Sequence, residues 1–304
     1  MDGGRVMKTI FFGPWAGEFG YEVAFWMGEC EKIRSLYPDY KSIVSSFYGR
    51  KILYQSFNLF LPHNISSNYT SLSCMFDGEN IIEHPEVSTY LKNADIIIRP
   101  KSSFNGIVLG GGNDLAITFQ KHKKIIPSAN YISLARTLTK NKKVISIFCR
   151  TAADIPDPKK NAWEESQWLS LIEALIKNNF FVVSLLAYYP QKKCFLENLQ
   201  TENFLNIGTS FKDNEDFCEI QAAFLNISQL AITTPCGGAQ LILKTETPCI
   251  YMLAEQNNDY HLLFKKLNEK SNTPIKYLFG NGHSMNIKIE ECLKTVESFF
   301  QNRD

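Results

Sequence analysis

The sequence predicts an α/β protein with two domains, and three observations support this prediction. The chain has 304 residues, and a domain usually takes about 100–200 residues. Its hydrophobic share of 44% provides enough apolar surface for two cores. From residue 143 to 255, apolar runs of strand length alternate with amphipathic runs of helix length. This alternation is typical of a parallel sheet whose strands are joined by right-handed helical crossovers.

The first half of the chain opens with a short apolar run, residues 9–12, which predicts a strand ending at Gly13. Residues 21–36 carry apolar side chains at helical spacing, and Pro38 closes this predicted helix. Further strands are expected at residues 41–46 and 94–98. The polar, turn-rich stretch between these two strands contains no pattern that predicts an element.

The second half of the chain is patterned more clearly. Strands are expected at 143–149, 180–186, 204–207, 230–233 and 248–253. Helices are expected at 164–178, 192–199, 216–225, 238–244 and 287–300. We therefore expect an N-terminal domain of residues 1–135, a second domain of residues 136–286 and a C-terminal helical segment, 287–304.

Composition and charge indicate which partners and which compartment to expect. Charged residues make up 21% of the chain and nearly cancel, with a formal net charge of +1, so nothing favours nonspecific binding to nucleic acid or anionic membranes. The eight cysteines form no C-x-x-C pair, as is typical of a reducing compartment. The N-terminus has no signal-peptide pattern, and no apolar run is long enough to cross a bilayer. We expect a cytoplasmic protein with no nucleic-acid partner and no membrane span.

Several catalytic motifs are absent. The sequence contains no P-loop, no G-x-S-x-G elbow and no H-E-x-x-H. Its five histidines are scattered without metal-ligand spacing, and no D-x-D pair could hold a metal against a diphosphate. The sequence therefore predicts neither a metal nor another cofactor.

Ligands of open parallel sheets bind at the carboxyl ends of the strands, so the loops after strands are the candidate sites. The first such loop contains Gly17, Glu18 and Gly20. The two glycines let the backbone approach a ligand, and Glu18 is a candidate general base. Alternatively, Glu18 only favours the N-terminus of the following helix.

The second loop follows the predicted strand 143–149 and contains Arg150 and Thr151. A guanidinium at this position suits a diphosphate, to which Thr151 and Lys159 can add further donors. The alternative is a surface ion pair of Arg150.

The third loop is Thr234-Pro235-Cys236-Gly237-Gly238, between a predicted strand and a predicted helix. The glycines would expose backbone N–H groups at the helix start, and Thr234 can donate to the same anion. Cys236 has no histidine near it in sequence, so we do not expect a nucleophile there. Just past the strand 248–253, Glu255 is a candidate partner for a ribose hydroxyl.

These loops resemble those of the GT-B glycosyltransferases, and among them the heptosyltransferase-like group. The Gly17-Glu18 loop is similar to that group's N-terminal loop, which carries the catalytic base. Thr234 to Gly238 is similar to its donor-binding loop. The resemblance covers most of the second half of the chain and only the opening of the first.

A weaker similarity links the strand ending at Arg150 to the fucosyltransferase pattern H-x-R-R-x-D. Phe148 stands at the histidine position, a second arginine is missing, and Asp154 lies one residue too far along. The pattern therefore does not indicate a fucose donor.

The resemblance implies two Rossmann-like domains that face each other across a cleft, with the C-terminal helix packed back toward the N-terminal domain. It implies a metal-independent, inverting transfer of a sugar from a nucleotide-sugar to the hydroxyl of a glycan, lipid-linked or protein acceptor. Glu18 would be the base, and Arg150 with the 234–238 loop would bind the donor. Two alternatives remain open: a sugar-nucleotide epimerase of the same fold, and a non-catalytic nucleotide- or sugar-binding protein.

Overall fold

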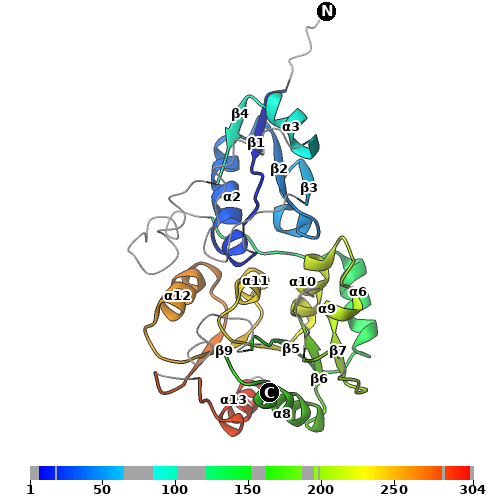
Figure 1. Ribbon diagram of the computed structural model, residues 1–304, viewed down its shortest axis with the longest axis vertical. Helices are drawn as coiled ribbons and strands as arrows, with labels where there is room; N and C mark the ends of the chain where they lie inside the picture. Colours follow the sequence, from blue (N-terminus) through cyan, green and yellow to red (C-terminus); the bar gives the residue numbers. More distant parts are fainter. Residues whose placement is uncertain are drawn as a thin grey trace, which may run out of the picture. The chain divides into compact units, whose positions relative to one another are not determined.

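The computed structural model describes residues 7–17, 19–64, 85–100, 121–151, 162–186, 195–197, 199–282 and 285–301. The chain divides into two compact units, Met1–Ile125 and Ile126–Asp304. Each unit has its own parallel sheet with helices packed against it (Figure 1). The expected fold class, α/β with two Rossmann-like halves, is confirmed. The expected domain boundary, 135/136, lies within helix α6 (Ala129–Leu138), which packs against α10 (Phe217–Ile227) in the second unit.

The first unit holds a four-stranded sheet in the order β3-β2-β1-β4, with every pair parallel. Its strands are β1 (Thr9–Phe12), β2 (Lys41–Phe47), β3 (Leu59–His63) and β4 (Ile96–Ile98). Its helices are α1 (Phe19–Tyr21), the π-helix η1 (Glu22–Trp26), α2 (Met27–Leu36), the 3₁₀-helix η2 (Lys51–Tyr54) and α3 (Pro85–Lys92). The helical run predicted from residue 21 is therefore interrupted by a π-helical turn.

Apolar side chains from the sheet and from α3 form a core in the first unit. Phe11 and Ile43, on the two central strands, pack with Val87 and Leu91 of α3. Successive side chains of a strand point to opposite faces of the sheet, and the register partners Phe11 and Ile43 both lie on the face that meets α3. Burial of such side chains is the main stabilising contribution.

The second unit holds a six-stranded sheet in the order β10-β9-β8-β5-β6-β7, again with every pair parallel. Its strands are β5 (Val144–Phe148), β6 (Phe181–Ser184), β7 (Phe204–Asn206), β8 (Leu230–Thr233), β9 (Cys249–Leu253) and β10 (Ile275–Phe279). Its helices, besides α6 and α10, are α8 (Glu165–Lys177), α9 (Ile207–Ser210), α11 (Gly237–Thr245), α12 (Asp259–Ser271) and α13 (Ile289–Gln301). The strand order reverses between β5 and β8, and such a reversal is where this kind of sheet binds ligands.

The final helix, α13, belongs to the core of the second unit. Its apolar face, with Cys292 and Val296, is buried there, and the rings of Phe300 and Phe180 lie 5.0 Å apart. Helix α13 also packs along α8. The expectation that this helix packs toward the N-terminal domain stays a prediction.

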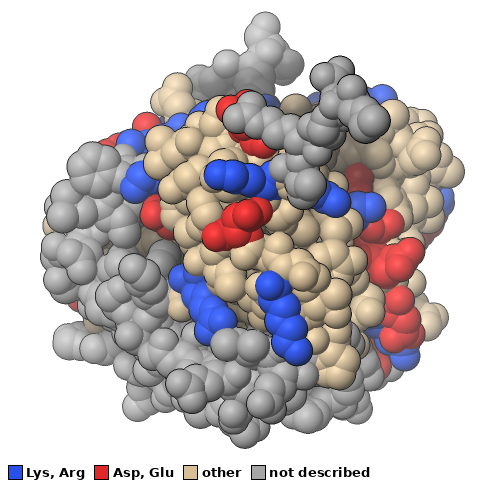
Figure 2. Space-filling model, turned by 90° about the horizontal axis from the view of Figure 1, so that it is seen from above, with Lys and Arg blue, Asp and Glu red and all other residues tan. Residues whose placement is uncertain are grey.

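The helices of the described residues include none that is long and apolar enough to cross a membrane. On the face drawn in Figure 2, basic and acidic side chains both occur, and neither covers that face alone. This mixture agrees with the near-neutral net charge of +1.

Candidate functional site

Two of the three predicted loops meet where the strand order of the second sheet reverses. Strands β5 and β8 are neighbours, and Phe148 is paired with Thr233 at their carboxyl ends. The chain leaves β5 into Arg150 and leaves β8 into the 234–238 loop. Because the carboxyl ends of parallel strands lie at one edge of the sheet, these two loops are adjacent.

Arg150 is held in place from both its side chain and its backbone. Its Nη1 donates a hydrogen bond to the carbonyl oxygen of Pro235, at 2.9 Å. The indole Nε1 of Trp168 donates to the carbonyl of Arg150 at 3.2 Å. The next residue, Thr151, is buried. The structure thus brings Arg150 and the 234–238 loop into direct contact.

Thr234 places a buried hydroxyl in the same loop. Its Oγ1 has no hydrogen-bond partner within the described structure, and the residue is 0% exposed. The neighbouring Thr233 differs, because its hydroxyl donates to the carbonyl of Thr234 at 2.8 Å. A buried hydroxyl without a partner costs free energy, so Thr234 is suited to donate to a bound ligand.

Cys236 precedes helix α11 as its N-cap residue, and its carbonyl accepts a hydrogen bond from the N–H of Ala239 at 3.1 Å. Burial raises the pKa of its thiol, while the Thr233 hydroxyl and the positive charge of Arg150 act in the opposite direction. A raised pKa disfavours the thiolate, so Cys236 is unsuited to act as a nucleophile. Its backbone, rather than its sulfur, is suited to a ligand.

Gly238 has a packing reason to be glycine. A Cβ atom built at this position would lie 2.3 Å from Cδ1 and Cε1 of Phe148. Helix α11 can therefore lie on β5 only because this residue has no side chain. The sequence suggested that Gly238 binds a phosphate. The close packing against Phe148 explains why this residue is glycine without invoking a ligand. Gly237 begins α11 itself.

Glu255 lies beyond the end of β9, with its side chain exposed. The preceding residue, Ala254, accepts a hydrogen bond from the N–H of Gly282 at 2.9 Å. Gly282 has a φ of +84°, which suits glycine, and a Cβ there would lie 3.4 Å from Oε2 of Glu255. Because β9 lies two strands from β5, Glu255 is at the same carboxyl edge as Arg150.

The remaining predicted loop, which contains Gly17, Glu18 and Gly20, lies in the first unit, after β1. Gly13 has a φ of +104°, and a Cβ there would lie 2.6 Å from the carbonyl oxygen of Ser45. The N–H of Trp15 donates to that same oxygen at 2.9 Å, which fixes the start of the loop on β2. Gly17 and Gly20 follow, both partly buried. The candidate base Glu18 and the candidate donor ligand Lys159 lie outside the described residues.

The sequence did not predict the buried carboxylate of Glu22. This residue opens the π-helix η1 and is 0% exposed. Its Oε1 accepts hydrogen bonds from the hydroxyls of Ser46 and Tyr54, the latter at 2.6 Å, and its Oε2 forms an ion pair with Arg50. The indication of this buried carboxylate in the sequence was an acidic residue at a helical position that faces the core.

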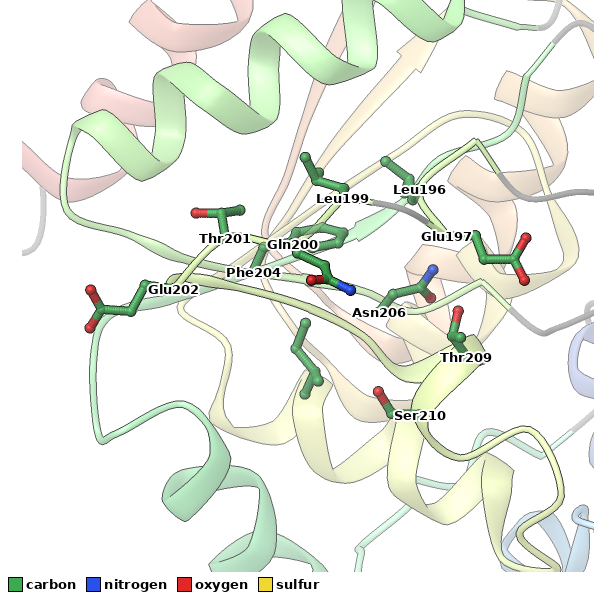
Figure 3. Close-up of a pocket in the computed structure, with 11 residues that line it drawn as sticks. Leu196, Glu197, Leu199, Gln200, Thr201, Glu202, Phe204, Asn206, Thr209 and Ser210 are labelled. Atoms are coloured by element: carbon green, nitrogen blue, oxygen red, sulfur yellow. The ribbon is translucent and has the colours of Figure 1, made fainter.

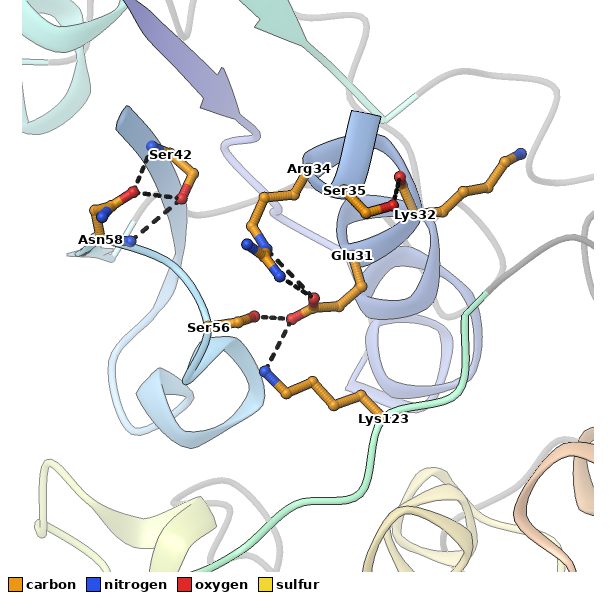
Figure 4. A network of polar contacts seen from close by, with 8 residues as sticks. All are labelled: Glu31, Lys32, Arg34, Ser35, Ser42, Ser56, Asn58 and Lys123. Atoms are coloured by element: carbon orange, nitrogen blue, oxygen red, sulfur yellow. Dashed lines mark hydrogen bonds and ion pairs between the residues drawn. The ribbon is translucent and has the colours of Figure 1, made fainter. Parts of the chain in front are cut away.

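A second buried carboxylate in the first unit, Glu31 of α2, holds a similar network (Figure 4). Arg34 lies 3.1 Å away and Lys123 3.4 Å away, and the hydroxyl of Ser56 donates to Glu31 as well. Lys123 belongs to the segment that follows β4, so this network attaches that segment to α2.

A cavity of about 490 Å³ lies elsewhere, at the outer strand β7 of the second sheet (Figure 3). It is lined in part by Leu196, Gln200, Phe204, Asn206, Thr209 and Ser210. None of the predicted site residues that the structure describes lines it, and β6 separates it from β5. We therefore place the candidate site at the point where the strand order reverses, because of the side chains that meet there and not because of a cavity.

No family model matches the sequence, and no curated protein matches it in sequence. Solved structures do match its fold. The structure of the ADP-heptose LPS heptosyltransferase II from E. coli is 12% identical, with a TM-score of 0.64 over 98% of this chain and 100% of that chain. A glycosyl transferase family 9 structure from Veillonella parvula is 12% identical, with a TM-score of 0.64 over 97% of both chains. The resemblance to heptosyltransferases is thus confirmed for the fold.

The expectation that no metal takes part is contradicted by a third match. The glycosyltransferase TibC of enterotoxigenic E. coli is described as iron-containing, and it matches with a TM-score of 0.51 and 9% identity over 98% of this chain and 77% of that chain. Proteins of this fold therefore include one with iron. Within the described ranges, no three His, Cys, Asp or Glu side chains are grouped so that they could hold a metal ion.

Proposed function

We propose that this protein is a glycosyltransferase, which moves a sugar from a nucleotide-sugar donor to an acceptor hydroxyl. The observation that carries the proposal is the pairing of Arg150 with the 234–238 loop at the reversal point between β5 and β8. The fold shared with heptosyltransferases supports the same reaction class.

The donor's diphosphate is the ligand that this site suits. The guanidinium of Arg150 supplies a fixed positive charge with several N–H donors, and bidentate contacts with phosphate are strong. The hydroxyl of Thr234, which has no hydrogen-bond partner among the described residues, can donate to the same anion. Helix α11 begins at Gly237, and its first N–H groups favour a negative charge. Thr151 and Lys159 would add further contacts, and Glu255 would accept a hydrogen bond from a ribose hydroxyl.

The proposed reaction is a single displacement at the anomeric carbon, which inverts its configuration. The bond from this carbon to the diphosphate oxygen breaks, and a bond to the acceptor oxygen forms. The acceptor's proton passes to Glu18. Arg150 and the 234–238 loop stabilise the negative charge that develops on the leaving nucleoside diphosphate, which is electrostatic catalysis.

The first experiment is a thermal-shift panel of ADP, UDP, GDP, CMP and dTDP, each with and without Mg²⁺ or Fe²⁺. ADP comes first, because a similar structure is named as an ADP-heptose transferase. A nucleotide at a hundredfold excess over its Kd stabilises the folded protein by about 2.7 kcal/mol. We expect one nucleotide to raise the melting temperature of the wild type.

The variant Arg150→Met tests the site, and Arg136→Met, at an exposed arginine of α6, is the matched control. We expect Arg150→Met to abolish the nucleotide-induced shift and Arg136→Met to retain it. The proposal is wrong if no nucleotide stabilises the wild type at millimolar concentration. It is also wrong if Arg150→Met binds as the wild type does.

A further inference from the structure

The first unit buries an ion pair beside its predicted loop. The carboxylate of Glu22 is 0% exposed, and its partner Arg50 is 19% exposed. Ser46 and Tyr54 donate to the same carboxylate, so three chain segments converge on Glu22. A buried carboxylate is tolerated only when it is paired and hydrogen-bonded in this way. Every donor therefore contributes to holding η1 against β2 and η2.

Arg50 makes two aromatic contacts in addition to its ion pair. Its guanidinium carbon lies 4.6 Å from the centroid of the Phe47 ring and 5.4 Å from that of Phe19. Both distances are within the range of cation–π attraction. A planar guanidinium can pair with a carboxylate and lie over rings at once, which an ammonium group does less well.

The two rings connect Arg50 to the carboxyl edge of the first sheet. Phe47 is the last residue of β2, and Phe19 begins α1, directly after the loop with Gly17. Ligands of parallel sheets bind at this edge. The π-helix that follows α1 begins at Glu22, and π-helical turns occur often at functional sites.

We infer that Arg50 is a positioning residue, which fixes residues 19–22 through its contacts with Phe19 and Glu22. The inference rests on the proposed function for its catalytic meaning, because the candidate base directly precedes this segment in the sequence. Arg50 contacts Phe19 on one side and Glu22 on the other, so it holds both ends of the segment. Arg50 acts through this segment and does not itself react.

The first unit provides a matched control for this inference. Arg34 pairs with the buried Glu31 at 3.1 Å, and its guanidinium carbon lies 5.7 Å from the Phe57 ring. The two arginines thus share their chemistry: a buried carboxylate and a phenylalanine ring. Among the described contacts of these two arginines, those of Arg50 reach the segment beginning at Phe19 and those of Arg34 do not.

Hydrogen exchange of the full chain tests the positioning role without any substrate. We expect Arg50→Lys to speed exchange of the amides in residues 15–26 by about tenfold, because a hydrogen bond to a charged group contributes about that factor to local opening. Arg34→Lys should leave those amides unchanged. Phe19→Leu is the second variant, which decides the test if Arg50→Lys fails to fold. It keeps an apolar side chain but removes the ring, so it should also speed the exchange of these amides. Equal exchange in wild type, Arg50→Lys and Phe19→Leu overturns the inference.

Turnover tests its catalytic meaning. The probe is hydrolysis of the nucleotide-sugar whose nucleotide stabilises the wild type, with water as the acceptor. We expect Arg50→Lys to lower kcat at least about tenfold with KM for the donor unchanged, and Arg34→Lys to match the wild type. A wild type that binds no nucleotide refutes the proposed function and leaves the exchange result to decide the positioning role. A wild type that turns over at the same kcat as Arg50→Lys refutes the positioning role alone.

Discussion

Replacing Gly238 by alanine tests whether packing or ligand binding requires glycine at the start of α11. The added Cβ would lie 2.3 Å from two carbons of the Phe148 ring and 2.9 Å from a third. Phe148 is only 2% exposed and lies on β5, next to the centre of the sheet. The ring is therefore surrounded by packed atoms, so either it or α11 has to move.

The size of the effect follows from this overlap. An extra methyl group in a filled core typically costs about 1–3 kcal/mol. The better helix propensity of alanine offsets less than about 1 kcal/mol of this, because the residue lies in the first turn. We expect Gly238→Ala to lose about 1–2 kcal/mol of unfolding free energy, with a melting temperature lower by about 2–4 °C per kcal/mol.

Urea denaturation followed by circular dichroism measures the loss, and a second substitution identifies its cause. Phe148→Leu makes room for the methyl group, so the double variant should be more stable than the two single losses predict, with a coupling of about 1 kcal/mol. An alanine variant as stable as the wild type would refute the packing argument. Strictly additive losses would refute it as well.

Two further predictions concern buried hydroxyls. Thr234→Val removes a buried hydroxyl that has no partner in the described part of the chain, so it should stabilise the protein by about 1 kcal/mol while reducing the nucleotide-induced thermal shift. Thr233→Val, which loses a hydrogen bond of 2.8 Å, should destabilise it; a full nucleotide shift in Thr234→Val would contradict the binding role. Burial raises the pKa of Tyr277 from 10.0 to about 12, so its contribution to stability is complete below pH 10 and is lost as the pH rises toward 12. Urea denaturation at pH 8 and pH 11 measures how much unfolding free energy is lost at the higher pH. This loss should be smaller in Tyr277→Phe than in wild type or in the exposed control Tyr260→Phe, and equal losses would contradict the prediction.

Most central strands were predictable because they are buried on both faces. Every residue of strands β5 and β9 is buried, and all of their side chains except Ser146 of β5 are apolar, which is the pattern of a strand covered on both faces. The edge strands β3 and β10 were not predicted. Strand β3 contains Pro62. An edge strand tolerates a proline, but a proline in a sequence pattern argues against a strand, so β3 was not recognised. Helix α6 was missed because the lysines and asparagines at its end suggested a linker.

The contact between Arg150 and Pro235 could be predicted in outline because topology produces it. Both residues follow parallel strands, so the alternation of strands and helices already places their loops at one edge. The Glu22 network could not be predicted in this way. Its partners lie 24, 28 and 32 residues further along the chain, in segments whose local patterns say nothing about Glu22. Only the folded chain brings Ser46, Arg50 and Tyr54 to one carboxylate.

The two arginines at carboxyl edges are held in different ways, and this difference fits two roles. Arg50 pairs with a buried carboxylate, which cancels its charge and leaves its planar shape as its main contribution. The contact of Arg150 with the carbonyl of Pro235 fixes the direction of its guanidinium. A guanidinium held in a fixed direction suits an anionic leaving group, since no reorganisation is then needed during the reaction. The ion pair of Arg50 with the buried Glu22 instead suits a role in ordering the chain around it.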